Sequence, residues 1–332
     1  MSVPPISPVA AALRAEILAA AEAELARSAG ALAEPASDAA TPQQPPPAMA
    51  TLDLARAAAA VRQGGLAPLF ADLAKAAAQP GLPAPVRAGI AQVLALRTPL
   101  AGPLTAEDVK RAVAQSGLFL EAGLARGAEP PPDLKAALLR LGAALTAARG
   151  GETGAEPPAK VPPPPVRGAA LSAQPAASST LPADAEAPAI VQHLQAQVEQ
   201  AVARQTLHQL ASLPDGQGAA WMFELPLVTP QGTALAQFEV QRDGHAAGGE
   251  LVPGWRLRFC VDIEPLGPVQ VHLGLAGDRA AVTLWAERPQ ALEALRREAP
   301  ALARALPAEV MLHAGAPHPA APPPGRFLDR TS

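Results

Sequence analysis

Strict alternation of apolar and polar side chains is concentrated in one stretch of this chain, residues 219–287. It is clearest in WRLRFCVDIE at 255–264, where large apolar residues occupy every second position and charged residues fill most of the others. Successive side chains of a β-strand point to opposite faces, so this pattern predicts a sheet with one apolar face. Leucines return at helical spacing over 289–306, and a last short strand is expected through Val310 and Leu312.

The sequence therefore predicts an α+β fold, in which a small mixed β-sheet near the C-terminal end is covered by one helix. Its core should consist of large apolar residues that share the inner face of the strands, together with leucines of the following helix. The predicted core residues are Trp221, Phe223, Phe238, Trp255, Leu257, Phe259, Val261, Ile263, Val271, Leu273, Leu284, Leu292, Leu295 and Leu302.

Helical periodicity dominates the chain before this sheet. Ala- and Leu-rich segments broken by Pro predict helices over 9–28, 51–62, 66–78, 84–97, 105–125, 132–149 and 189–212. Thr105, followed by Glu107 and Asp108, is typical of a helix N-terminus. Because an Ala side chain buries little apolar area, the helices over 51–149 form either a small bundle or a loosely associated set.

Two Pro-rich stretches, 35–48 and 150–188, are predicted to lack helix and sheet, because Pro fixes φ and has no backbone N–H. The chain is thus expected to begin with a Pro/Ala-rich leader that is partly helical and partly disordered. The expected organisation is a helix plus a disordered segment over 1–50, a helical region over 51–149, a linker over 150–188, a C-terminal domain over 189–314 and a flexible tail over 315–332.

Composition narrows the functional classes. The 332 residues include 40 Pro and only 3% aromatic residues, so most of the chain offers few large side chains to a core. A net charge of −4 with both signs mixed gives no basic stripe for nucleic acid. Cys260 is the only cysteine, which excludes an intrachain disulfide. The chain shows neither the basic segment of a cleavable signal peptide nor an apolar run of about 18 residues, so we expect a protein made in the cytoplasm.

No catalytic constellation is recognisable. The chain has no P-loop and no Gly-x-Ser-x-Gly motif, and its six His residues are not spaced as zinc ligands. Asp262 and Glu264 lie on one strand face, but Arg256 and Arg258 share it, which favours a charge ladder facing solvent or a partner. We therefore predict no catalytic residue, no cofactor, no metal site and no small-molecule substrate, and do not expect an enzyme.

One connection between two well-patterned strands is distinctive. Glu264-Pro265-Leu266-Gly267-Pro268-Val269 combines two stiffening Pro residues with a Gly that can adopt positive φ. One interpretation is a rigid hairpin corner with no further role. The other is that this corner and the charged strand face beside it form a docking surface.

These residues resemble the C-terminal domain of bacterial flagellar hook-length control proteins. The resemblance extends over about 215–315 and rests on the segments at 255–273 and 282–287, followed by the Leu-spaced helix. The residues that match the family's corner are Leu266, Gly267, Val269, Val271 and Leu273. A Pro/Ala-rich leader before one compact domain also agrees with the family, although this leader is unusually helical.

The resemblance implies a protein that is exported unfolded through the flagellar type III apparatus and so secreted, and whose leader measures the growing hook. It implies a C-terminal domain that switches export specificity by contacting the cytoplasmic domain of the export-gate membrane protein, with hook and hook-cap subunits as further partners. Candidate partner-binding residues are Pro265, Leu266, Gly267, Val269, Arg256, Arg258, Asp262, Glu264 and, in the tail, Phe327 and Leu328. The alternative is a non-enzymatic scaffold protein with a tethered β domain.

Overall fold

The computed structural model describes residues 48–100, 102, 104–125, 132–149, 161–213, 219–247, 250–277, 279–306 and 308–317, with backbone alone at 48–50, 243–247 and 250–253. The helix predicted over 9–28 and the tail residues Phe327 and Leu328 lie outside the described residues.

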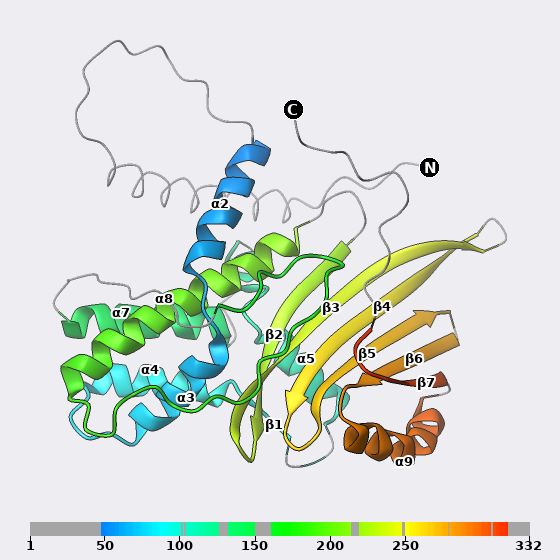
Figure 1. Ribbon diagram of the computed structural model, residues 1–332. Coiled ribbons are helices and arrows are strands. Elements are labelled where there is room, and N and C mark those ends of the chain that lie inside the picture. Colours follow the sequence, from blue (N-terminus) through cyan, green and yellow to red (C-terminus); the bar gives the residue numbers. More distant parts are fainter. Residues whose placement is uncertain are drawn as a thin grey trace, which may run out of the picture.

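The described elements form one β-sheet and a set of helices, most of which precede the sheet in the sequence and are called the helical part (Figure 1). The helices are α2 (Ala48–Arg62), α3 (Leu66–Ala77), α4 (Ala84–Ala95), α5 (Ala106–Ala114), α6 (Leu120–Leu124), α7 (Leu134–Arg149), α8 (Ala187–Ala211) and α9 (Pro289–Ala305). The strands are β1 (Thr98–Pro99), β2 (Ala219–Thr229), β3 (Gly232–Ala247), β4 (Glu250–Ile263), β5 (Gly267–Ala276), β6 (Arg279–Ala286) and β7 (Ala308–Ala314). The predicted α+β class is confirmed.

The strands lie side by side in the order in which they occur along the chain. β2 to β6 form an antiparallel meander, whereas β1 and β7 pair in parallel fashion at the two edges. The register places Phe223, Phe238, Phe259, Val271 and Leu284 opposite one another across five strands. Because directly opposed residues share a face, this row defines the apolar face of the sheet.

Helices cover both faces of the sheet. The loop after α5 covers the β2 end of the apolar face through Leu118, and α9 covers the β5–β7 end through Leu292. On the opposite face, Leu235 of β3 joins the core of the helical part, to which α3, α4, α7 and α8 contribute. Figure 1 shows these four helices gathered on one side of the sheet and α9 at its other end.

Of the helices over 48–149, α3, α4 and α7 are packed together as a small bundle, whereas α5 packs against the apolar face of the sheet. Leu69, Phe70, Leu138, Leu141 and other large side chains of this part are fully buried in one core. Helix α8, predicted to belong with the sheet, contributes to the same core. The sheet and the helical part are therefore in direct contact through α8.

The predicted core of the sheet is largely present but less buried than expected. Its buried members are Phe223, Val271, Leu284 and Leu292. Its partly buried members are Trp221, Phe238, Leu257, Phe259, Val261, Ile263, Leu273, Leu295 and Leu302. The prediction was wrong for Trp255, which is 40% exposed and stacks on Trp221 with ring centroids 6.0 Å apart. Trp255 lies at one end of the apolar face, level with the first residue of β2 and the next-to-last residue of β5, and it keeps contact with solvent there.

The single helix predicted over 105–125 is in fact two, α5 and α6. Gly117 between them has φ +94°, and the Ser116 hydroxyl donates to the Val113 carbonyl 2.7 Å away, which ends α5. The predicted helix start is confirmed, since Thr105 and Asp108 form a reciprocal capping box.

Residues 161–186, which we name the strap, are the described part of the linker predicted over 150–188. The strap contains almost no regular secondary structure, yet Leu171 and Leu181 are buried and Gln174 forms a β-bridge with Leu235. In Figure 1 it is the green chain that passes between α8 and the strands. Its polar backbone is satisfied by side chains of the helices and of β3, which local sequence patterns do not reveal.

Candidate functional site

The corner between β4 and β5, residues 264–269, is the candidate site that the sequence indicated. Ile263 and Gly267 pair at the ends of the two strands, so the connection between them is tight. The Glu264–Pro265 peptide bond is cis, and Gly267 has φ +70°. That backbone conformation is rarely adopted by residues with a side chain, which explains the Gly at this position.

Arg288, the residue before α9, holds the corner from outside. Its guanidinium donates to both carboxylate oxygens of Glu264, at 2.5 and 2.7 Å, and to the Pro265 carbonyl at 3.1 Å. The hydrogen bonds from Arg288 lower the pKa of Glu264, and those same bonds raise the pKa of Arg288. Both side chains are about half exposed, so the pair contributes little stability. The main effect of this ion pair is to hold the corner in a fixed position relative to α9, because a bidentate pair restricts the orientation of both side chains.

The guanidinium also fills the space beside Gly267. A Cβ added to Gly267 would lie 2.8 Å from both Cδ and Cζ of Arg288. The positive φ favours glycine at this position, and a larger residue would in addition displace the Arg288 side chain from the corner.

Asp262 and Glu287 add negative charge next to the corner. Burial raises the pKa of Asp262, and the charges of Glu264 and Glu287 raise it further, while Arg288 acts in the opposite direction. The corner thus presents a rigid turn with three carboxyl groups around one guanidinium. Such a surface could recognise a partner by shape and charge.

The charge ladder predicted from Arg256 to Glu264 does not form one surface. Arg258 is paired with Glu239 of β3 and donates to the Ala169 carbonyl of the strap at 3.0 Å. Glu264 lies six positions after Arg258, a distance of about 20 Å at ~3.3 Å per residue. The structure therefore assigns Arg258 to the strap and Glu264 to the corner. Arg256 is exposed on the same strand.

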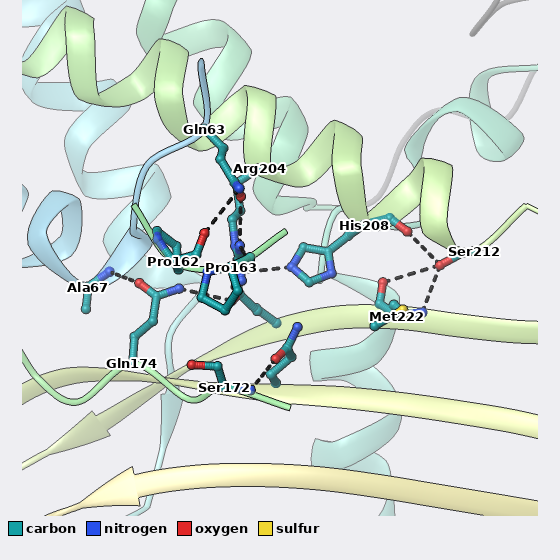
Figure 2. Close-up of polar contacts among 12 residues, drawn as sticks. Gln63, Ala67, Pro162, Pro163, Ser172, Gln174, Arg204, His208, Ser212 and Met222 are labelled. Carbon is teal, nitrogen blue, oxygen red and sulfur yellow. Dashed lines mark hydrogen bonds and ion pairs between the residues drawn. The ribbon is translucent and has the colours of Figure 1, made fainter. Parts of the chain in front are cut away.

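A second group of functional side chains, which sequence reasoning missed, is buried between α8 and β2 (Figure 2). Arg204 is fully buried and donates to Glu224 at 2.7 Å, to the Gln63 side chain at 2.7 Å and to the Pro163 carbonyl at 2.7 Å. His208, one turn further along α8, places Nε2 3.3 Å from a Glu224 oxygen. This group joins the residue after α2, the strap, α8 and the sheet.

Burial sets the protonation states in this group. It would raise the pKa of Glu224, but the charge of Arg204 and the contact with His208 hold that pKa well below its usual range. Burial lowers the pKa of His208, and Glu224 offsets this only in part. At neutral pH the group thus contains one ion pair and a neutral imidazole.

A signal for this group was present in the sequence. Both faces of β2 carry apolar residues around Glu224, since Met222 and Pro226 alternate with Phe223 and Leu225. A strand that is apolar on both faces is buried on both, so a charged residue within it requires a buried partner.

Among the described residues, no cluster of three or more His, Cys, Asp or Glu is arranged to hold a metal ion, and no helix is long and apolar enough to cross a membrane. Cys260 is buried, and burial raises the pKa of its thiol. A buried thiol with a raised pKa is a poor nucleophile.

Comparison with known proteins gives one match. No curated protein and no solved structure matches this chain. Residues 245–311, about a fifth of the chain, match the family model described as the flagellar hook-length control protein FliK. The matched segment begins in the β3–β4 hairpin and includes the corner, β5, β6, Arg288, α9 and most of β7. Over these residues the chain carries the hook-length control domain of the flagellar family.

Proposed function

We propose that this protein controls the length of the flagellar hook and switches the specificity of flagellar export through its C-terminal domain. The match of residues 245–311 to the family model carries this proposal. That family consists of structural and regulatory flagellar proteins rather than enzymes.

In this proposal the corner is the contact that switches export. Glu264 and Pro265 are exposed, and Arg288 fixes their position, so a partner would meet a preformed surface. The partner would be the cytoplasmic domain of the export-gate membrane protein. Hook and hook-cap subunits would be met by the rest of the chain during export.

Length measurement would be the task of the chain before the sheet, exported in an unfolded state. Residues 1–214 would span ~700 Å fully extended, at about 3.3 Å per residue. The same residues would span ~320 Å as continuous helix, at about 1.5 Å per residue. The helical bundle would have to unfold before threading, so the measured length depends on how much helix re-forms.

A deletion of the gene tests the function. The expected phenotype is overlong hooks without filaments, and normal hook lengths would refute the proposal. Arg288→Ala then tests the corner, with Arg296→Ala as the control, because Arg296 lies on α9, the helix that Arg288 precedes, and is paired with the exposed Glu293. We expect overlong hooks with the first variant and normal hooks with the second.

A scaffold protein is the second candidate, and one observation favours it. The bundle, the strap and the sheet share buried polar groups, including the Arg204–Glu224 pair, which an exported chain must break. Site-specific cross-linking from position 265 in living cells separates the two candidates. Cross-links to the export gate support the switch, whereas cross-links only to other partners support the scaffold.

A further inference from the structure

The strap binds the sheet mainly through its backbone. Gly168 N–H donates to the Glu239 carboxylate at 3.1 Å, and Ser172 N–H donates to the Gln237 side chain at 2.7 Å. Gln174 and Leu235 exchange backbone hydrogen bonds of 3.0 and 2.8 Å. Along these contacts the residue numbers rise in the strap while they fall in β3, so the strap runs antiparallel to β3.

The structure explains why β3 accepts this segment. β4 pairs with β3 only from Gln237 onward, where Gln237 lies opposite Cys260. Beyond that point the last residues of β4 pair with β5 alone, and Leu235 is left with an N–H and a carbonyl that β4 does not use. The strap supplies these two hydrogen bonds, as an added strand would.

Few strap side chains take part in this contact. Leu171 is the buried apolar anchor, in a cluster with Met222 and Cys260. Gln174 also donates to Glu224 at 3.0 Å and accepts from the Ala67 N–H, as Figure 2 shows. The remaining recognition is of backbone groups, which every extended peptide has.

The two ends of the strap are held separately from its middle. The Pro163 carbonyl is bound by Arg204 at one end. At the other end the buried carboxylate of Asp72 accepts hydrogen bonds from Ser179 and Thr180. The middle can therefore leave β3 while both ends stay in place, since the contacts that it would lose are local.

We propose that the edge of β3 over residues 233–236, before the point where β4 begins to pair with it, is a strand-addition site, which the strap occupies within the chain and which an extended segment of a partner protein takes over. The partner segment runs antiparallel to β3 and places an aliphatic side chain where Leu171 lies. This inference does not depend on the flagellar function, because it concerns the opposite face of the sheet from the apolar row.

Cys260 provides the readout, because it is the only cysteine and is 3% exposed under Leu171. The full chain is alkylated with iodoacetamide at increasing urea concentrations, and global unfolding is followed by circular dichroism. Opening of the strap alone exposes little surface, so the labelling rate should be nearly independent of urea at low concentrations. A labelling rate that follows global unfolding at every urea concentration would overturn the proposal.

A variant and a peptide complete the test. Leu171→Ser should speed the labelling of Cys260 by about tenfold. This corresponds to a loss of roughly 1.4 kcal/mol in the free energy that keeps the strap closed. Val166→Ser is the control, because Val166 lies on the same strap but is exposed, and it should leave the rate unchanged.

A synthetic peptide of residues 165–176 should slow labelling in the Leu171→Ser protein, whereas the same peptide with Ser at the Leu171 position should not. Equal effects of the two peptides would refute a specific strand-addition site. If Leu171→Ser does not fold, the urea dependence of the unaltered chain decides the question by itself.

Discussion

Replacing Arg204 by Met would test whether the buried ion pair determines how the helices are held to the sheet. Met keeps much of the length of the Arg side chain but removes its charge and every donor. Glu224, which is 1% exposed, would then be a buried carboxylate without its cation. The Gln63 side chain and the Pro163 carbonyl would each lose a 2.7 Å hydrogen bond.

The expected cost follows from these losses. Removing one partner of a buried pair typically costs about 3–5 kcal/mol, because the other charge stays buried and unpaired. The total stability of a domain is about 5–15 kcal/mol, so this variant would lose a large fraction of it. The exposed pair of Arg296 and Glu293 is the control, and its loss should cost ~1 kcal/mol or less.

Urea unfolding followed by far-UV circular dichroism measures both variants. With a slope of roughly 2–3 kcal/mol per molar urea, the midpoint of Arg204→Met should fall by about 1–2 M. The double variant Arg204→Met with Glu224→Leu should recover most of this loss, since no charge remains buried. Loss of the cation also leaves burial to raise the pKa of Glu224, so the single variant should be less destabilised at pH 5 than at pH 8. A single variant within 1 kcal/mol of the unaltered protein, or a double variant no more stable than the single, would refute the reasoning.

Three further predictions concern other parts of the structure. The pKa of His208 is lowered on folding, so its contribution to stability is present above pH ~6.5 and is lost as pH falls below that value. Between pH 7.5 and 5.5 the free energy of unfolding should therefore fall less in His208→Gln than in the unaltered protein. An equal fall in the two proteins would contradict this. Gly267→Val should lower the free energy of unfolding by about 1–3 kcal/mol and impair switching. Gly274→Ala, where an added Cβ has no neighbour within 4 Å, should be nearly neutral. Equal melting temperatures of the two variants would show that the corner tolerates a side chain. Thr105→Ala removes the capping box of α5 and should cost about 1 kcal/mol in thermal unfolding, and an unchanged melting temperature would mean that α5 contributes nothing to the cooperative fold.

The corner shows how far the sequence alone could lead. The alternation in β4 and β5 and the Gly at 267 predicted a tight connection, and the same residues carried the family resemblance. Arg288 was not recognised as part of this site, because it lies 24 residues from Glu264 and only the packing of α9 brings the two together. Trp255 illustrates the opposite error, since its position in the strand pattern is right but the described helices leave it partly exposed.

The sequence by itself determined the elements of this protein, because helix and strand periods, capping residues and turn glycines act between neighbours along the chain. Only the tertiary structure decided that Gln63, 141 residues from Arg204, completes a buried polar group, and that a Pro-rich segment lies along the edge of β3. The reason is physical. Which polar groups are buried together depends on which faces meet, and each such group must find a partner at that contact, wherever in the sequence that partner occurs.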